Sequence, residues 1–366
     1  MKRILVSGLS VDIGGIGTLV TNVVSYNKRI GNSQEFVFEF LIPYQSVYRT
    51  WFQQEHYTYY EIPSLKQWFR YRTFLRQFFR KRHYDYVWIN NTSKVDIWLP
   101  WIAKHIGGAK IIQHAHGTDC EEKGIRRLIF KLCECLWGKA YEKLIDIPLA
   151  CSSLSADYFY RCPVLREKCT VLHNGINVDQ FKFNESVRFT TRQALGLTDE
   201  NILLGAVGRL TKVKNYPFLI DLMKHLPQSH HCIIIGDGED KDLLEKQIDG
   251  LKLQDRVQLL GQRRDIPDLL CAMDILVMPS LNEGLPFSLI EAQASGLRCV
   301  CSEGIPKEAD LLKHAHFINL SSMTEWVKTC GEKSNEPFDR ILCNRMVKQA
   351  GYSIETSYDN FIRLLE

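Results

Sequence analysis

Short apolar runs recur along the whole chain, and segments of helical periodicity lie between most of them. In the first half these strand candidates are Ile4–Ser7, Phe36–Leu41, Tyr86–Asn90, Lys110–His114 and Ile147–Cys151. In the second half they are Leu203–Val207, Cys232–Ile235, Val257–Leu260, Ile275–Met278 and Cys299–Ser302. Strands that alternate with helices predict βαβ units and parallel sheets. Ten strands exceed one comfortable sheet, so the pattern predicts an α/β protein with two Rossmann-like, doubly wound domains.

The helical segments and one turn-rich stretch indicate where these domains meet. The helices expected most clearly are Thr18–Lys28, Pro217–Leu226, Asp240–Leu251 and Pro286–Ser295. Residues 173–179 read HNGINVD, which is typical of a turn, and they follow a strand-like run at 170–172. We therefore expect a first domain over residues 1–176 and a second over residues 177–351.

Composition excludes several classes of protein. The 366 residues suit two domains, at roughly 150 residues per domain. The twelve cysteines include no C-x-x-C pair, which argues against a zinc ribbon or a thioredoxin-type redox site and favours the reduced thiols of a cytosolic protein. No stretch approaches the ~20 consecutive apolar residues of a membrane-spanning helix.

Positive charge is concentrated in the first half of the chain. Residues 1–170 carry 24 Lys and Arg against 15 Asp and Glu, a formal net charge of +9, whereas the remainder carries −5. Within this half, Leu65–Arg82 carries seven basic residues, no acid and an aromatic stripe at helical spacing. Such a helix can lie in a membrane interface, so we expect contact with an anionic membrane surface. The alternative is a helix packed on its own sheet with a solvated basic face. No nucleic-acid reading motif is present, and we expect no nucleic-acid partner.

A loop between an apolar strand and a helix carries two glutamates. Residues 279–296 read PSLNEGLPFSLIEAQASG, with Glu283 in the loop and Glu291 inside the helix that begins near Pro286. The free N–H groups of a helix start attract anions and polar ligands. A carboxylate accepts hydrogen bonds from paired hydroxyls, as on a sugar or a ribose. The alternatives are a helix-end acid for Glu283 and a surface residue for Glu291.

This segment resembles the retaining glycosyltransferase family 4, in whose signature seven residues separate two glutamates. It is most similar to the branch that builds bacterial capsular polysaccharides and exopolysaccharides, where the sequence IPKE at 305–308 also has a counterpart. The resemblance implies the GT-B fold, two Rossmann-like domains facing across a cleft. The first domain would bind the acceptor, the second would bind the nucleotide-sugar donor, and a final helix within 352–366 would return to the first. Glu291 would bind the ribose, and the donor sugar would lie against Glu283, Gly284, Leu285, Pro286 and Phe287.

A basic loop follows the first strand of the second domain. Residues 205–215 read GAVGRLTKVKN, which places Arg209 and Lys214 five positions apart before a helix. Arg offers a planar fork to phosphate oxygens, and Lys offers a point charge. The pattern resembles the family's G-R-L-x-x-x-K segment, which implies that both residues hold the nucleotide diphosphate. Lys212 is extra, and we expect it to be solvated.

Two glycine turns have weaker patterns. Gly236 opens a G-D-G turn that resembles the family's loop beside the nucleotide, and its spacing differs from the G-x-G-x-x-G fingerprint of dinucleotide sites. After the first strand, residues 14–17 read GGIG, and the resemblance implies that Gly15 and Gly17 lie in a loop over the diphosphate. The alternative is an ordinary tight turn.

No metal or cofactor is expected beyond the nucleotide-sugar co-substrate. Asp240 and Asp242 form an Asp-x-Asp pair, but acids in the first turn of a helix are explained by the helix macrodipole. The resemblance also implies a reaction without a catalytic metal.

Two histidines end a strand in the first domain. His114 and His116 alternate along the strand and therefore lie on one face. A structural role is the alternative. The resemblance implies that His116 contacts the donor sugar, with His114 as the second choice.

Together with these residues, the resemblance implies a retaining, metal-independent glycosyltransferase of the hexosyltransferase type. The catalytic residues would be His116, Glu283, Arg209 and Lys214. We expect a UDP-sugar donor and a glycan or polyprenyl-diphosphate-linked acceptor, used in surface polysaccharide synthesis. The protein would be cytoplasmic and peripheral at the inner face of the cell membrane.

Two other functions stay open. A UDP-sugar 2-epimerase can have the same fold, but it needs extra acid–base carboxylates and no acceptor. A non-catalytic, basic membrane-binding module would need neither the glutamates nor the basic loop.

Overall fold

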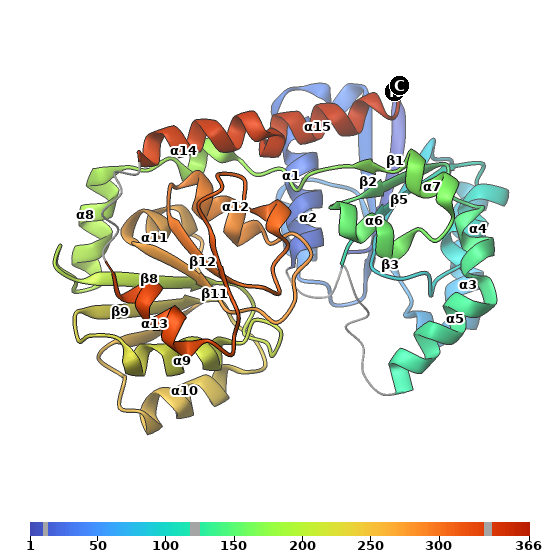
Figure 1. Cartoon of the computed structure of the whole chain (residues 1–366). Coiled ribbons are helices and arrows are strands. Elements are labelled where there is room, and N and C mark those ends of the chain that lie inside the picture. The colour runs from blue at the N-terminus through green and yellow to red at the C-terminus, as the bar shows by residue number, and fades with distance from the viewer. Residues whose placement is uncertain (10–13, 118–124, 333–338) are drawn as a thin grey trace. The chain divides into compact units, whose positions relative to one another are not determined.

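The computed structural model describes residues 1–9, 14–117, 125–332 and 339–366. Contacts divide the chain into two compact units, shown in Figure 1. The N-terminal unit comprises Met1–Gly175 and Ile354–Glu366, and the C-terminal unit comprises Ile176–Ser353. Cys120, one of the twelve cysteines, lies outside the described residues.

The N-terminal unit is built on a seven-stranded parallel sheet with the order β3-β2-β1-β4-β5-β6-β7. Its strands are β1 (Lys2–Ser7), β2 (Phe36–Pro43), β3 (Tyr59–Ile62), β4 (Tyr86–Asn91), β5 (Lys110–Ala115), β6 (Ile147–Ala150) and β7 (Thr170–Val171). Its helices are α1 (Gly15–Arg29), α2 (Tyr48–Gln54), α3 (Trp68–Lys81), α4 (Trp98–His105), α5 (Ile125–Glu142), α6 (Ser153–Phe159), α7 (Pro163–Lys168) and α15 (Ile354–Arg363).

The final helix packs on the N-terminal sheet. The ring centroid of Phe361 in α15 lies 4.4 Å from that of Trp88 in β4. The hydroxyl of Tyr358 donates a hydrogen bond to Oδ1 of Asn27 in α1, at 2.6 Å. The opposite face of the sheet is covered by α3 and α4, whose apolar residues share a core with Val87 and Ile89. Helices therefore cover both faces of this sheet, as in a doubly wound fold.

The C-terminal unit repeats this architecture on a six-stranded parallel sheet with the order β10-β9-β8-β11-β12-β13. The strands are β8 (Ile202–Val207), β9 (His230–Ile235), β10 (Val257–Gly261), β11 (Ile275–Met278), β12 (Arg298–Ser302) and β13 (His316–Ile318). The helices are α8 (Glu185–Ala194), α9 (Tyr216–His225), α10 (Lys241–Gly250), α11 (Ile266–Ala272), α12 (Phe287–Ala294), α13 (Met323–Gly331) and α14 (Arg340–Val347).

Alternating residues of the C-terminal strands enter two separate cores. Leu276 and Met278 of β11 pack with α11, α12 and α14. Ile275 and Val277 of the same strand pack with α9, α10 and α13. Every second side chain of a strand points to the same face, so the apolar run of β11 is buried on both sides.

The predicted fold class, two Rossmann-like α/β domains, is confirmed, and the strands missed by the sequence analysis lie at sheet edges. β3 and β13 each pair with only one neighbour. Their residues are mostly half-buried, so neither strand has the continuous apolar run of a central parallel strand. Within the described residues, no helix combines the length and the hydropathy that a membrane crossing requires.

Candidate active site

In the C-terminal unit, the predicted donor residues lie on the two loops that flank the point where the strand order reverses. That point lies between β8 and β11. Ligands of open α/β sheets bind outside the carboxyl ends of the strands at such a point. Arg209 and Lys214 follow β8, and Glu283 follows β11. Strand order therefore brings together two loops that are separated by about 70 residues in sequence.

Lys214 and Glu283 form an ion pair between these loops. Nζ of Lys214 donates to Oε1 of Glu283 at 2.6 Å, and the two side chains are 19% and 14% exposed. A backbone hydrogen bond also joins the two loops, because the N–H of Leu281 donates to the carbonyl of Val213 at 2.8 Å. The two residues that were expected to hold different parts of a donor are thus directly coupled.

Glycines allow the neighbouring turns to approach closely. A Cβ on Gly236 would lie 2.0 Å from the carbonyl oxygen of Gly208, and the φ of Gly236 is +143°. A Cβ on Gly208 would lie 2.8 Å from the Tyr216 hydroxyl and 3.0 Å from Cε of Lys214. Any side chain at either glycine would therefore displace the basic loop or Lys214 itself. Burial, with a smaller contribution from Glu283, raises the pKa of the Tyr216 hydroxyl, which stays protonated.

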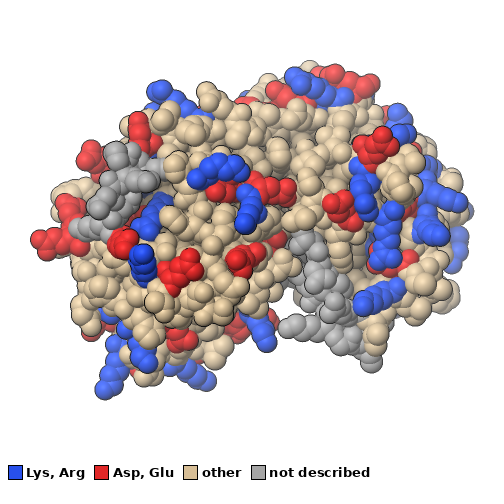
Figure 2. Space-filling model, in the orientation of Figure 1, with Lys and Arg blue, Asp and Glu red and all other residues tan. Residues whose placement is uncertain are grey.

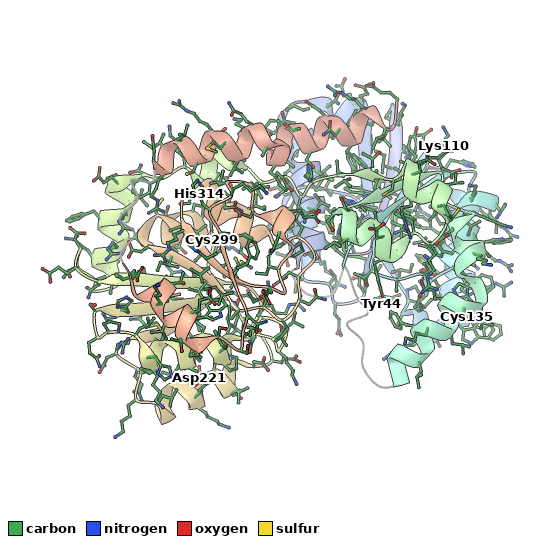
Figure 3. The ribbon with its side chains drawn as sticks, viewed as in Figure 1. Tyr44, Lys110, Cys135, Asp221, Cys299 and His314 are labelled. Carbon is green, nitrogen blue, oxygen red and sulfur yellow. The ribbon has the colours of Figure 1, made fainter. Side chains whose placement is uncertain are left out.

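The helix α12 begins directly after the Glu283 loop. Gly284 lies in this loop and is partly exposed, Leu285 is buried, and Pro286 caps the helix that starts at Phe287. Cys299, labelled in Figure 3, lies in the core that packs beneath this helix. The N–H of Leu289 donates to the carbonyl of Pro286 at 3.2 Å, so the N–H groups at this helix start without a helical partner are those of Phe287 and Ser288.

Glu291 sits within α12 among apolar neighbours. Both adjacent residues, Ile290 and Ala292, are fully buried. Burial disfavours the charged form and raises the pKa of the Glu291 carboxyl to about 7. A carboxyl with such a pKa is half-ionised near neutral pH, which is typical of functional sites.

The remaining charged residues considered in the sequence analysis are exposed or lie at the start of a helix. Arg209 and Lys212 are both exposed. Asp240 precedes α10, and Asp242 lies in its first turn. In the described part of the chain, no group of three or more His, Cys, Asp and Glu side chains is arranged to hold a metal ion.

In the N-terminal unit, the strand order reverses between β1 and β4, and polar groups gather beside that point. His116 follows β5, the next strand after β4. Its Nε2 lies 3.1 Å from Oδ1 of Asn90 in β4. Burial lowers the pKa of His116 to about 3, so its imidazole is neutral at physiological pH. The ring of His114 lies 4.2 Å from that of His116 but is completely buried.

The predicted glycine loop is a helix start, which corrects the sequence analysis. The helix α1 begins at Gly15, so Gly15 and Gly17 lie in its first turn rather than in a loop before Thr18. Tyr48 explains the need for glycine, because a Cβ on Gly17 would lie 1.7 Å from the Tyr48 hydroxyl. That hydroxyl also accepts a hydrogen bond from the N–H of Gly14 at 3.3 Å.

The basic segment Leu65–Arg82 forms a short 3-10 turn followed by α3. Its aromatic stripe is divided, because Tyr71 and Phe78 are buried whereas Trp68 and Phe69 are exposed. Its basic residues are likewise partly packed against the protein and partly exposed. The guanidinium of Arg72 lies over the ring of Trp98, at 4.5 Å. The exposed basic residues of this segment are Lys66, Arg70, Arg80 and Lys81.

Three contributors to these sites were missed by the sequence analysis: Tyr48, Asn90 and Tyr216. Asn90 ends a predicted strand, and a polar residue at a strand's carboxyl end is a weak signal that could have been used. Tyr48 and Tyr216 act through contacts with glycines, which the sequence alone does not reveal.

The sequence of this chain is similar to those of known glycosyltransferases. Residues 187–348 match the family model of glycosyl transferases group 1. EpsF of Bacillus subtilis (strain 168), named a glycosyltransferase, is 36% identical over 148 residues, which are 40% of this chain and 38% of EpsF. The UDP-Gal:alpha-D-GlcNAc-diphosphoundecaprenol alpha-1,3-galactosyltransferase of Escherichia coli is 30% identical over 237 residues, 62% of this chain and 60% of that enzyme. The match thus spans less than two thirds of the length of either relative.

Solved structures resemble the whole chain at low identity. HepE of Anabaena, solved in complex with UDP and glucose, has a TM-score of 0.82 and 20% identity, covering 100% of this chain and 99% of HepE. The lipopolysaccharide outer core galactosyltransferase WaaB has a TM-score of 0.69 and 17% identity, with 100% and 99% coverage. These likenesses confirm the two Rossmann-like domains of the GT-B fold.

Proposed function

We propose that this protein is a group 1 glycosyltransferase that transfers a hexose from a UDP-sugar with retention of the anomeric configuration. The acceptor is a glycan or a polyprenyl-diphosphate-linked glycan of surface polysaccharide synthesis. The ion pair of Lys214 and Glu283 at the strand-order reversal carries the proposal, because it joins a phosphate-binding type of loop to a hydroxyl-binding type of loop. The family match over residues 187–348 covers both loops.

In the proposed reaction, the C-terminal unit holds the donor. Lys214 and Arg209 stabilise the charge that develops on the diphosphate as it leaves. Glu283 and the free N–H groups at the start of α12 orient the sugar, and Glu291 accepts hydrogen bonds from the ribose hydroxyls. The acceptor hydroxyl attacks on the same face that the diphosphate leaves, which accounts for retention without a protein nucleophile. In the N-terminal unit, His116 contributes a neutral imidazole that can form a hydrogen bond with a hydroxyl.

Product analysis tests the proposal and separates it from its alternatives. The protein is incubated with UDP-glucose or UDP-galactose, with and without a diphosphate-linked glycan acceptor, and UDP release and product are measured. We expect a glycosylated acceptor with retained configuration. A changed donor sugar without acceptor would indicate the epimerase. Absence of UDP binding would indicate a non-catalytic module.

The reaction is proposed to need no metal ion. Asp240 and Asp242 are placed as acids at the start of α10, where the helix macrodipole stabilises them. EDTA should therefore leave transfer unchanged. Loss of transfer with EDTA, restored by Mg²⁺ or Mn²⁺, would contradict this part of the proposal.

We further propose that the N-terminal unit contacts an anionic membrane surface from the cytoplasmic side. Figure 2 shows Lys and Arg side chains gathered on the edge of this unit that carries α3 and α4 in Figure 1. Trp68 and Phe69 are 48% and 67% exposed at the start of α3, near the exposed Lys66 and Arg70. The helix α5 adds an exposed row of Leu128, Leu132 and Leu136. Basic residues beside exposed apolar side chains favour a membrane interface.

A further inference from the structure

The second half of α5 is fixed to the N-terminal unit by a buried ion pair. Tyr141 and Glu142, near the end of the helix, are both buried. Oε1 of Glu142 lies 2.6 Å from Nζ of Lys94, and the two side chains are 6% and 2% exposed. The backbone N–H groups of Arg161 and Cys162 donate to the same carboxylate, each at 2.9 Å. Such a pair holds both partners in one geometry. The helix therefore has a fixed orientation within this unit.

The first half of α5 exposes a row of leucines. Leu128, Leu132 and Leu136 are 66%, 58% and 66% exposed, and residues four apart lie on the same side of a helix. Cys135, labelled in Figure 3, is also exposed beside this row. Figure 1 shows that the first turns of α5 extend away from the sheet. Exposed apolar side chains gathered in this way indicate an interaction surface.

The charges beside the leucine row are basic. Lys131 lies three residues after Leu128, Lys139 lies three residues after Leu136, and both lysines are exposed. The two acids of α5 are already paired, since Glu142 is buried against Lys94 and Glu134 forms an ion pair with Arg161 at 3.0 Å. An apolar face bordered by lysines is typical of a helix that lies in the interface of an anionic membrane.

A second copy of the chain fits this surface less well. Symmetric packing of two α5 helices would bring Lys131 and Lys139 of both copies together, and the paired acids of α5 would not compensate them. Three leucines are also far fewer than the roughly 20–30 residues on each side of a standard protein interface. A lipid surface, in contrast, offers an apolar phase to the leucines and anionic groups to the lysines.

We infer that α5 is the membrane-inserting helix of this protein, with its leucine row in the acyl-chain boundary and its lysines at the head groups. The inference rests on the proposed membrane contact and divides it into two contributions. The attraction of α3 is mainly Coulombic and is screened by salt, whereas burial of the leucines is not. Because Lys94 follows β4, the ion pair also fixes the orientation of the N-terminal sheet on the membrane.

The thiol of Cys135 allows insertion to be observed directly. The other cysteines that the structure describes are buried or half-buried. An environment-sensitive fluorophore on Cys135 should shift to shorter wavelength on vesicles of anionic lipid, and nitroxides on the acyl chains should quench it. Labelled Cys135→Ser gives the background, and Lys246→Cys added to it places the probe on the C-terminal unit, where neither change should occur. A Cys135 probe that stays in water while the protein sediments with vesicles would overturn the inference.

Vesicle sedimentation then measures what the leucines contribute. Replacing Leu128, Leu132 and Leu136 with Gln should weaken binding about a hundredfold or more, because these side chains no longer gain from leaving water. This loss should be the same at low and high salt, whereas the loss caused by removing charge from α3 should shrink as salt is raised. A loss from the leucine substitutions that disappears at high salt would contradict insertion.

The matched control replaces three leucines on other helices, Leu154, Leu243 and Leu342, with Gln. These side chains are 49%, 55% and 49% exposed, and the control should bind vesicles as the parent does. Equal losses in both leucine variants would overturn the inference. A lipid-free dimer that the α5 substitutions dissociate would also overturn it, because the row would then belong to a second copy.

Failure of the proposed function gives different results. A parent protein that binds no anionic vesicle would remove the proposed membrane contact and the inference together. Transfer to a short, soluble acceptor and UDP binding report on the glycosyltransferase itself, and both should persist in the α5 variant because its substitutions lie outside the proposed donor site.

Discussion

The two units repeat one architecture but place different chemistry at the reversal of their strand order. In the C-terminal unit, charged side chains meet there, and Lys214 and Glu283 lie 2.6 Å apart. In the N-terminal unit, the neutral amide of Asn90 and the neutral imidazole of His116 lie beside that point, and Lys94, which follows β4, is buried in an ion pair with Glu142. The same fold thus carries different polar groups in its two copies, since these groups are supplied by residues at the strand ends and not by the sheet.

We expect this difference to give each unit a distinct role. Charged groups that are partly shielded from water stabilise a leaving diphosphate strongly, because charge develops there during the reaction. Neutral groups orient hydroxyls and cost less to bury. In the N-terminal unit, the outer helix α3 carries the exposed basic residues Arg70, Arg80 and Lys81. We expect three experiments to separate these roles.

The largest expected effect follows removal of the charge on Lys214. Lys214→Ala should lower kcat/KM roughly 100-fold to 1000-fold, the scale of one lost transition-state donor. The substitution also leaves the partly buried Glu283 without its partner, so Glu283→Gln and the double variant complete a double-mutant cycle. Lys212→Ala removes an exposed lysine from the same loop and should leave turnover unchanged. Normal turnover by folded Lys214→Ala would remove the diphosphate assignment.

How far the sequence predicts this site depends on the type of residue. Arg209, Lys214 and Glu283 were identified because charged residues in glycine-containing loops after strands form a recognisable pattern. The contact of Lys214 with Glu283 was not predictable from spacing alone, since it requires β11 to lie beside β8. Asn90 was missed because a neutral amide at a strand end looks like many solvated residues. Its hydrogen bond to the carbonyl of Ser7 orients its amide, and that is a three-dimensional property.

The sequence patterns also predicted some elements of the fold better than others. Central strands such as β8 and β11 were predicted because their residues are buried on both faces of the sheet. The edge strands β3 and β13 were missed because they are short and half-exposed. The start of α1 was placed three residues late, at Thr18, because Gly15 and Gly17 are poor helix formers. The contact of Gly17 with Tyr48, which requires glycine there, is not visible in the local sequence.

A smaller effect is expected when charge is removed from α3. Replacing the exposed Arg70, Arg80 and Lys81 with Gln should weaken binding to vesicles of anionic lipid about a hundredfold, at ~1 kcal/mol per charge. Transfer to a short, soluble acceptor should persist because these residues lie outside the proposed donor site. Vesicle sedimentation at increasing salt measures the effect, and binding of the parent protein should weaken as salt is raised.

The C-terminal unit supplies the control for this experiment. Lys224, Lys246 and Lys328 are also exposed, and replacing them with Gln removes the same amount of charge. Vesicle binding should then stay close to that of the parent. Equal losses in both triple variants would mean that net charge, and not the surface of α3, attracts the membrane. Undiminished binding of the α3 variant would make this helix a structural element with a solvated face.

The smallest expected effect is a pH dependence of UDP binding that arises from the C-terminal unit alone. The pKa of Glu291 is raised to about 7, so in the free protein this carboxyl takes up a proton as the pH falls below neutrality. Ribose hydroxyls donate hydrogen bonds to the ionised form, and UDP must therefore displace the proton at low pH. UDP affinity should be constant above pH 7 and fall about tenfold per pH unit below it.

Calorimetry of UDP binding between pH 5.5 and 8.5, in buffers with different ionisation enthalpies, measures both the affinity and the released proton (about one per UDP at the low end). Glu291→Gln should bind UDP more weakly at pH 8 and lose the pH dependence. The same substitution should raise the stability of the free protein at pH 8, because a raised carboxyl pKa means that ionisation destabilises the folded state as the pH increases. His116, whose pKa is about 3, stays neutral throughout this range, so His116→Ala should leave the pH profile of UDP binding unchanged. If the pH dependence of UDP binding persists in Glu291→Gln but disappears in His116→Ala, the titrating group belongs to the N-terminal unit and not to the C-terminal unit.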